Sequence, residues 1–470
     1  MPDKLQRHFN TIGIGLYALA LIIVSIAFHD YALRVHWILW GVATVLWFFL
    51  MTYLGYKKSK HDPSKTFIRK VFWTALAIRV VYVLGIIFYY SMQTGIPMEY
   101  RAADSLNYHE TATYLSQLAR EGYFNAIFQQ LDARTMGFSD QGYSLYLTIL
   151  YSIFGNNTIL PRLLKALMSA YMCVAIYKLS ARNLDERTAK LAAIFAVFLP
   201  QFIHYNGTYL KETEMLFLAT LALERFDDLI HNRKHWIGKL IFVTLLTALT
   251  FGFRTIIGMI LIGSYIVMIL FTEKKELSTK AKIITLSVIT AITIIFLITP
   301  IGKEMVFTIK LNFKESNYLV VKYNAKGMRY ADYASYKTMA PGVFVLPLTN
   351  LVEVANENQK MMNGTYFIKN YLAFFAMWCI IAAFRDKKWK SFRLIGSYTI
   401  AYALIIAFSF AVNSERYHLP ALPGIIIMAA FAMTHFRKKD FPYYYAFDGI
   451  LLVAIIAWNY LKLSGRGLIF

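Results

Sequence analysis

Long apolar stretches, separated by short polar loops, follow one another along almost the whole sequence. A stretch of about 17 to 23 apolar residues is long enough to cross a bilayer as a helix. The pattern predicts about thirteen such spans, at 11–28, 35–55, 71–91, 158–179, 188–206, 209–229, 236–252, 255–271, 283–301, 366–384, 392–411, 417–435 and 443–461. The stretch 142–155 is strongly apolar over only about a dozen residues, so it predicts a re-entrant or interfacial segment.

The composition agrees with a membrane protein. Of the 470 residues, 58% are hydrophobic and 16% are charged, whereas a soluble domain is about half apolar and about a quarter charged. The sequence therefore predicts an all-α polytopic membrane protein. Cys173 and Cys379 both lie inside apolar runs, so they indicate neither a disulfide framework nor a metal-binding spacing. No cleavable signal peptide is expected, because His29 and Asp30 follow the first apolar run where small residues would mark a cleavage site.

Most of the net charge of +22 can be explained by the orientation of the protein in the membrane, without a negatively charged ligand. Lysine and arginine concentrate in the cytoplasmic loops of membrane proteins. If 142–155 does not cross, the basic loops all fall on one side; they lie at 57–70, 182–190, 225–234, 274–282, 385–393 and 437–439. That side is then cytoplasmic, and most of the positive charge orients the protein and does not indicate a nucleic-acid partner.

Two longer segments, 92–141 and 302–365, then lie outside the membrane, and loops of this length are usually functional or disordered. In the first, Asp104 is a candidate N-cap and Gly122 a candidate C′ residue of an amphipathic helix on the outer membrane surface. Its apolar face has helical spacing and consists of Leu106, Tyr108, Thr111, Ala112, Leu115, Leu118 and Ala119. The second segment, rich in aromatic and basic residues, predicts a partly ordered flap.

These features divide the chain into four parts. Residues 1–70 hold two spans and a basic loop, and 71–301 form a transmembrane module that contains the first external loop at 92–157. Residues 302–365 form the external flap, and 366–470 hold the C-terminal spans.

Ionisable residues from separate parts of the chain gather at the outer ends of the spans. Charged groups in or beside a span are costly and are therefore functional candidates. Only Arg79 falls near the middle of a span, where a transporter would place its ionisable groups. The outer level holds Asp104, Tyr108, His109, Glu110, Arg162, Lys165, His204, Tyr205, Lys211, Glu212, Glu214, Arg254, Glu415, Arg416, Tyr417 and His418. The pattern predicts a site at the outer membrane boundary.

The residue types at this level suit a phosphate that is carried by a lipid. Arginine offers two parallel donors to a phosphate, and lysine offers a compact positive charge. A nearby carboxylate could take a proton from an attacking hydroxyl as the phosphate leaves. The combination predicts glycosyl or phosphoryl transfer from a lipid phosphate.

Five segments carry a resemblance to a known superfamily. They are ADSLNYHETATYLSQLAREGYF, QGYSLYLTILYSIFGNN, the long stretch 161–223 that begins PRLLKALM, LLTALTFGFRTIIGMILIG and SERYHLPALPGIIIMAA. In their order and spacing the chain resembles the GT-C superfamily of membrane glycosyltransferases, in particular bacterial relatives of the protein O-mannosyltransferases and the lipid A aminoarabinose transferases. The resemblance covers 100–270 well and 410–435 moderately, so 71–301 is expected to be a GT-C-like module.

The resemblance implies transfer of a sugar from a polyprenyl-phosphate donor to a lipid-linked glycan, lipid A or a protein. The reaction would take place on the periplasmic side of the bacterial inner membrane, with inversion, and Asp104 would be the catalytic base. Relatives often carry a second acid directly after this residue, but Ser105 stands here, so a metal-independent reaction is expected. Relatives also often have His-Pro-Pro where this chain has Gln141, Gly142 and Tyr143.

Each candidate has a functional and a purely structural interpretation. Asp104 is also a simple N-cap candidate, Lys211 and Glu212 could form an ion pair at a helix end, and Arg254 could extend to the membrane interface. The candidates for binding the donor phosphate are Lys211, Arg254, Arg416 and Tyr417. The candidates for lining the site are Tyr108, His109, Glu110, His204, Glu212 and His418.

Two other functions remain open at this stage. An O-antigen-type polymerase or ligase would depend on arginines of the long external segments, such as Arg329, and not on Asp104. A transporter of lipid-linked glycans would move its ligand without forming a covalent product. No cofactor besides the lipid-phosphate sugar donor is expected, and the partners are membrane lipids and the glycan, lipid or protein acceptor.

Overall fold

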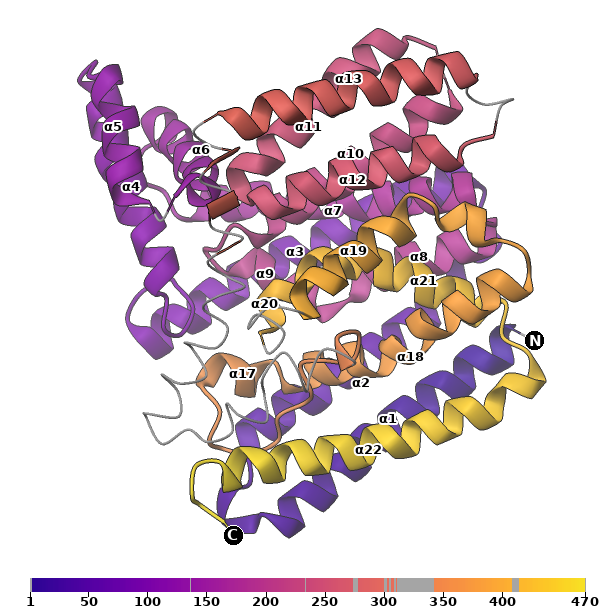
Figure 1. The fold of residues 1–470 in the computed structure, drawn as a ribbon. Helices are drawn as coiled ribbons and strands as arrows, with labels where there is room; N and C mark the ends of the chain where they lie inside the picture. The colour runs from indigo at the N-terminus through magenta and orange to yellow at the C-terminus, as the bar shows by residue number, and fades with distance from the viewer. Residues whose placement is uncertain are drawn as a thin grey trace.

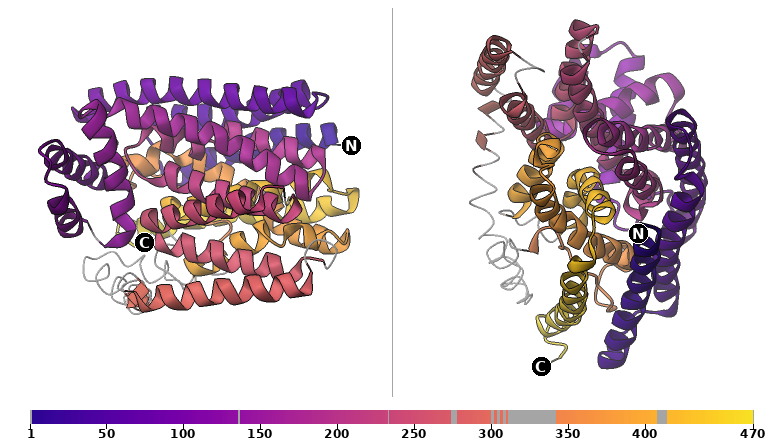
Figure 2. Two further views of the ribbon diagram at one scale, coloured as in Figure 1. Left: turned by 90° about the horizontal axis from the view of Figure 1, so that it is seen from above. Right: turned by 90° about the vertical axis from the view of Figure 1, so that its right-hand side faces the viewer.

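The computed structural model is a helical bundle in which the long helices run roughly side by side (Figures 1 and 2). It describes every residue except 1, 136, 233, 274–277, 300–301, 304–305, 308–309, 311–341, 408–413 and 470. Within the described residues the elements are helices, apart from an isolated bridge between Ala32 and Val352. The expected all-α polytopic fold is confirmed.

The helices follow the predicted order. The first three are α1 (Pro2–Ala27), α2 (Val35–Ser59) and α3 (Ser64–Thr94), and the first external segment forms α4 (Ala103–Arg120), α5 (Phe124–Arg134) and α6 (Phe138–Phe154). The central helices are α7 (Ile159–Asn183), α8 (Glu186–Phe198), α9 (Pro200–Gly207), α10 (Glu212–His231), α11 (Trp236–Phe253), α12 (Thr255–Phe271) and α13 (Thr279–Ile298). The C-terminal helices are α17 (Glu357–Met361), α18 (Asn363–Arg385), α19 (Ile395–Ala407), α20 (Glu415–His418), α21 (Leu422–Thr434) and α22 (Phe441–Ser464).

Each of the predicted spans falls on a helix or on two consecutive helices. Among the described residues, nine helical segments are long and apolar enough to cross a membrane. Helices α12 and α19 and the apolar part of α13 (Lys282–Ile298) are shorter. Helix α10 carries acidic residues at both ends. The exact number of thirteen spans is therefore not established by length and composition.

Helix α4 begins at Ala103, two residues earlier than a capping role for Asp104 requires. Its N-cap residue is Ala102, which makes no side-chain cap hydrogen bond, so the prediction of Asp104 as N-cap is wrong. Asp104 lies instead in the first turn, where a carboxylate interacts favourably with the helix dipole. The predicted end is confirmed, because Gly122 follows the C-cap residue Glu121 and has a φ of +83°, in the left-handed region.

Helices α4, α5 and α6 gather at one end of the bundle (Figure 1). A small apolar cluster of Leu115, Ile127 and Leu131, separate from the main core, holds the three helices together. Helix α6 covers the stretch expected to be re-entrant or interfacial, and it packs against α4 and α11. The first external segment is therefore an ordered helical layer attached to the end of the bundle.

Arg79 satisfies the backbone at a break in the bundle. Helix α8 ends just before Pro200, which lacks an N–H and starts α9. The fully buried Arg79 guanidinium donates to the carbonyl oxygens of Ala196 at 3.0 Å and Val197 at 3.2 Å, and to Ser169 Oγ at 2.7 Å. This residue therefore stabilises the helix break and gives no support to a transporter site.

The last part of the second external segment is buried inside the bundle. The Asn370 side chain accepts a hydrogen bond from Thr349 Oγ1 at 2.7 Å, and Asn459 Oδ1 accepts one from Leu351 N at 2.8 Å. These amides satisfy the irregular backbone that would otherwise be unpaired in an apolar environment. The aromatic and basic part of the expected flap, with Arg329, lies outside the described residues.

The basic loops meet at the end of the bundle opposite to α4. Contacts join one loop to the next: Lys190 Nζ to Asp62 O at 2.7 Å, Thr188 Oγ1 to Thr434 Oγ1 at 2.7 Å, Arg385 Nη1 to Asp440 Oδ2 at 2.9 Å, and Lys390 Nζ to Glu273 Oε1 at 3.4 Å. This gathering agrees with the common side that was expected for these loops. We refer to it as the basic end.

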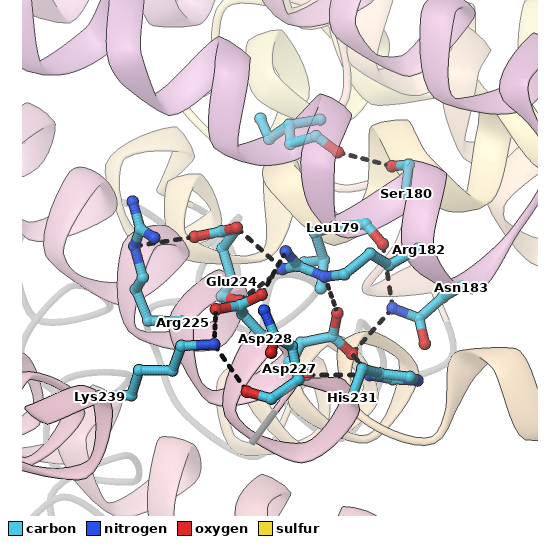
Figure 3. Close-up of polar contacts among 12 residues, drawn as sticks. Leu179, Ser180, Arg182, Asn183, Glu224, Arg225, Asp227, Asp228, His231 and Lys239 are labelled. Atoms are coloured by element: carbon cyan, nitrogen blue, oxygen red, sulfur yellow. Dashed lines mark hydrogen bonds and ion pairs between the residues drawn. The ribbon is translucent and has the colours of Figure 1, made fainter. Parts of the chain in front are cut away.

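A dense group of ion pairs lies at the same end, where α7, α10 and α11 meet (Figure 3). Arg182 is its centre, with Nε donating to Asp227 Oδ2 at 2.6 Å and Nη2 to Glu224 Oε1 at 2.9 Å. Lys239 Nζ lies 2.6 Å from Asp228 Oδ2. The group, called the Arg182 cluster below, consists of Arg182, Asn183, Glu224, Arg225, Asp227, Asp228, His231 and Lys239.

Candidate functional site

Asp104, Glu212 and Arg416 meet through their side chains although they lie far apart in the sequence. Asp104 belongs to α4, Glu212 is the first residue of α10, and Arg416 lies in α20. The Arg416 guanidinium donates from Nη1 to Asp104 Oδ2 and from Nε to Glu212 Oε1. The Asp104 side chain is 55% exposed and that of Glu212 is 1% exposed. Arg416 therefore joins a buried carboxylate to one that solvent and a ligand can reach.

A second ion pair lies directly beside the first. Lys211, which precedes Glu212, donates from Nζ to Asp140 Oδ1 and to the carbonyl oxygen of Ser139 at 2.5 Å. The Tyr108 hydroxyl donates to the same Asp140 oxygen at 2.9 Å. Lys211 is buried, whereas Asp140 is partly exposed. Two consecutive residues at the start of α10 thus connect α20 and α4 with the start of α6.

Asp140 is not among the site residues that the sequence pattern indicates. It is one of several acids in the first external segment, and nothing in the local pattern separates it from the others. Burial alone would raise the pKa of the Asp140 carboxyl, but the Lys211 ammonium, the hydrogen bonds from Lys211 and Tyr108, and the Arg254 charge together hold its pKa below the ordinary value. Asp140 is therefore ionised at neutral pH.

Arg254 adds a further cation to the site. It is the residue between α11 and α12, with an extended backbone (φ −164°, ψ 106°), and its side chain is partly buried. Its guanidinium carbon lies 4.7 Å from the centroid of the Tyr417 ring, and the Tyr402 hydroxyl donates to the Tyr417 carbonyl at 2.9 Å. No carboxylate of the described residues forms an ion pair with Arg254, which distinguishes it from Arg416 and Lys211.

Other outer cations support the segment that leads into α10. Arg162 Nε donates to the Gly207 carbonyl at 2.9 Å, and Lys165 Nζ donates to the Thr208 carbonyl at 3.1 Å. Both side chains are buried, and the Arg162 guanidinium also lies 4.8 Å from the Tyr209 ring centroid. Lys165 Nζ also lies 3.6 Å from Glu214 Oε2. Both cations therefore bind groups within the protein and support the segment before Lys211, and neither is available to a ligand.

The remaining predicted lining residues lie around this core at different distances. His109 Nδ1 lies 2.7 Å from the Tyr151 hydroxyl, and His204 Nδ1 lies 3.0 Å from the Tyr82 hydroxyl on α3. Burial lowers the pKa of His109, so its imidazole is neutral at pH 7. Glu110 is exposed and His418 is buried. The structure brings together Asp104, Tyr108, Asp140, Lys211, Glu212, Arg254, Arg416 and Tyr417, and the six charged residues among them form the site cluster.

The site cluster does not have the donor set of a divalent metal site. Each of its carboxylates already faces a cation, since Asp104 and Glu212 bind Arg416 and Asp140 binds Lys211. Within the described part of the chain there is no group of three or more His, Cys, Asp or Glu side chains that could hold a metal ion. Ser105, where relatives often carry a second acid, donates to Glu99 Oε1.

A comparison with protein families identifies the central part of the chain. Residues 142–299 match the model of the family described as dolichyl-phosphate-mannose-protein mannosyltransferase. The match supports the resemblance to GT-C superfamily membrane glycosyltransferases that the sequence motifs indicated. It includes Lys211, Glu212 and Arg254, whereas Asp104 and Arg416 lie outside the matched residues.

Comparisons over the whole chain give weaker likenesses. The crystal structure of the oligosaccharyltransferase of Archaeoglobus fulgidus, in complex with Zn and sulfate, is 17% identical, with a TM-score of 0.37. The alignment covers 69% of this chain and 44% of that one, so the chain spans less than half the length of that protein. No curated protein sequence matches this chain.

Proposed function

We propose, from the family match and the site cluster, that this chain is a GT-C membrane glycosyltransferase. It would move a sugar from a polyprenyl-phosphate donor to a hydroxyl of a lipid-linked glycan, lipid A or a protein. The observation that carries the proposal is the Arg416 guanidinium between Asp104 and Glu212, beside the Lys211 and Arg254 cations. A partly exposed carboxylate next to several cations has the groups that this reaction requires.

In the proposed reaction Asp104 acts as the general base. Its carboxylate accepts the proton of the acceptor hydroxyl, and the hydroxyl oxygen forms a bond to the anomeric carbon of the donor sugar. The bond between that carbon and the phosphate oxygen breaks at the same time, and the lipid phosphate leaves with the electron pair. A single displacement of this kind inverts the anomeric configuration. Glu212 orients Arg416, and Arg416 orients Asp104.

The cations have different availability for the leaving phosphate. Arg254 has no carboxylate partner among the described residues and is the first candidate to bind the phosphate, with the neighbouring Lys211 as the second. Arg416 is occupied by two carboxylates and would reach the phosphate after one of them moves away. Charge-assisted hydrogen bonds from these groups stabilise the charge that develops on the phosphate.

The site is proposed to face the periplasm from the bacterial cytoplasmic membrane. Helix α10 supports this orientation because Glu212 is its first residue, whereas Glu224 and Asp227 lie in its last two turns. A helix of 20 residues is about 30 Å long, close to the thickness of the hydrocarbon core. The site cluster and the basic end lie at opposite ends of this helix, and the positive-inside rule supports a cytoplasmic basic end and a periplasmic site.

Replacement of the base tests the proposal. Asp104→Asn preserves the side-chain shape but cannot accept the proton, so transfer from polyprenyl-phosphate sugars should fall by about 10² to 10⁴. Membranes that contain the protein would be incubated with radiolabelled polyprenyl-phosphate hexoses and pentoses, one at a time. Glu121→Gln, at the exposed C-terminal end of the same helix, is the matched control and should leave transfer unchanged.

Two results would contradict the proposal. Full transfer by the Asp104→Asn protein would remove Asp104 from the chemistry. Translocation of a lipid-linked sugar in vesicles, with no labelled product from any donor, would favour transport over transfer. Thermal unfolding of each variant in detergent establishes that a loss of activity does not reflect a loss of folding.

A further inference from the structure

Gly142 of α6 and Gly252 of α11 bring two helix backbones into direct contact. A Cβ atom placed on Gly142 would lie 2.6 Å from both the carbonyl carbon and the carbonyl oxygen of Gly252, and 3.1 Å from its Cα. Backbone atoms cannot turn away as the end of a flexible side chain can, so any side chain at position 142 would push the helices apart. A Cβ on Gly252 would lie 3.5 Å from Gly142 Cα, an ordinary contact. The close approach thus requires a glycine on one side.

This contact lies between two members of the site cluster. Asp140 stands two residues before Gly142, and Arg254 stands two residues after Gly252. Asp140 lies in the first turn of α6, and Arg254 is the C-cap residue of α11. Each charged residue is therefore close to the glycine contact along its own chain segment. The Arg254 charge also acts on the Asp140 carboxyl, which agrees with the proximity of the two side chains.

Lys211 shows why the separation of these helices matters. Its ammonium donates to Asp140 Oδ1 and to the carbonyl of Ser139, both in the first turn of α6. Lys211 belongs to the start of α10, and α10 packs against α11. A shift of α6 away from α11 would therefore carry Asp140 away from Arg254 and would change the position of the Lys211 ammonium.

We infer that the contact between Gly142 and Gly252 positions Arg254 next to the ion pair of Asp140 and Lys211, and thereby sets the place of the donor phosphate. The inference rests on the proposed function and assigns a positioning role to two residues that touch no substrate. It also gives a physical reason for the sequence Gln141-Gly142-Tyr143, because the small second residue is what permits the contact.

A double-mutant cycle separates positioning from general destabilisation. The probe is farnesyl phosphate, and the dissociation constant is measured for the full-length protein in detergent. Arg254→Gln alone should weaken binding roughly tenfold or more, because a hydrogen bond between charged groups is lost. In the Gly142→Ala protein the same Arg254 substitution should change binding less than about threefold, because coupled residues lose additivity.

Other glycines provide matched controls. A Cβ on Gly364 of α18 would lie 2.5 Å from the carbonyl oxygen of Gly41 on α2, so Gly364→Ala creates a similar backbone clash away from the site. In the Gly364→Ala protein, Arg254→Gln should still raise the dissociation constant for farnesyl phosphate about tenfold. Gly238→Ala in α11 meets nothing within 4 Å and should change neither binding nor stability. Gly252→Ala should reduce the coupling to Arg254 less than Gly142→Ala does, because its Cβ would make only an ordinary contact.

A second cycle decides the inference independently of phosphate binding. Asp140→Asn and Arg254→Gln, made singly and together, should show non-additive shifts of the thermal midpoint, and the coupling should vanish in the Gly142→Ala protein. If farnesyl phosphate does not bind the unsubstituted protein, the proposed function fails and this cycle alone decides the positioning role. Equal coupling with and without Gly142→Ala would overturn the inference.

Discussion

The two ends of α10 carry groups of charged residues that look alike in the sequence and differ in the structure. At the basic end, Arg182 binds Glu224 and Asp227 (Figure 3). Arg225 binds the second oxygen of Glu224, and Lys239 binds Asp228. At the other end, Arg416 and Lys211 bind the carboxylates, and Arg254 is left with an aromatic ring as its neighbour. The first group satisfies its own charges, whereas the second has a cation available.

This difference separates ion pairs that hold helices together from ion pairs that can bind a ligand. A buried ion pair whose members are all matched is expected to contribute to the arrangement of α7, α10 and α11 and to exclude other ions. An unmatched arginine next to an exposed carboxylate costs stability unless an anion completes it. Burial and charge counts alone would not have distinguished the two groups, because both contain deeply buried acids.

The largest effect on this comparison is expected from removing the available cation. Arg254→Gln should raise the dissociation constant for farnesyl phosphate about 10- to 150-fold, because a charge-assisted hydrogen bond contributes about 1.5–3 kcal/mol. Arg225→Gln in the Arg182 cluster is the matched control, and it should leave the dissociation constant unchanged. Equal losses in the two proteins would show that the two ends do not differ in the way described.

An effect of similar free energy, but on stability and not on binding, is expected at the basic end. Asp227→Asn keeps the shape of the side chain but removes the charge that accepts from Arg182 at 2.6 Å and from Asn183 at 2.9 Å. The free energy of unfolding should fall by about 1.5–3 kcal/mol, measured by denaturation in mixed detergent micelles. Binding of farnesyl phosphate to the folded protein should stay the same. A loss of binding without a loss of stability would contradict a purely structural role for this group.

The smallest effect concerns pH. The pKa of Asp140 in the folded protein is below its ordinary value. The ion pair of Asp140 with Lys211 therefore contributes its full stability above the unfolded-state pKa of about 4. This contribution is lost as the pH falls through the lower pKa of the folded state. Burial lowers the pKa of Lys211 to about 8, so the ammonium of this pair is lost as the pH rises through that value. The difference in thermal midpoint between the unsubstituted and Asp140→Asn proteins should therefore be constant from about pH 7 to pH 5. A difference that already shrinks between about pH 7 and pH 5 would show that Asp140 is not held in its ionised form.

The fold was predictable from the sequence to a large extent because membrane spans leave long apolar runs. The boundaries of α2, α7 and α18 follow these runs closely, whereas α3 begins seven residues before its predicted run at 71–91. The location of charged residues at the helix ends also followed from the pattern, since charges avoid the hydrocarbon interior. Asp104, Arg254 and Arg416 were selected in this way before their contacts were known.

The pairing of those charges could not be predicted from the sequence. Asp104 and Arg416 are separated by 312 residues, and no periodicity relates positions at such a distance. Asp140 does not stand out in the sequence because its contacts with Lys211 and Tyr108 depend on how the helices pack. Arg182 and Arg225 were interpreted as topology signals alone, although their acidic partners on α10 were visible in the sequence.

The long separation between Asp104 and Arg416 also has a consequence for biosynthesis. The ribosome synthesises Asp104 within the first quarter of the 470-residue chain, and Arg416 emerges only after most of the helices have been inserted into the membrane. Until then the carboxylate lacks the guanidinium that orients it, and a prematurely terminated chain would never acquire it. This ion pair therefore forms only after the helices between Asp104 and Arg416 have been synthesised, so chains that stop before Arg416 lack the complete site.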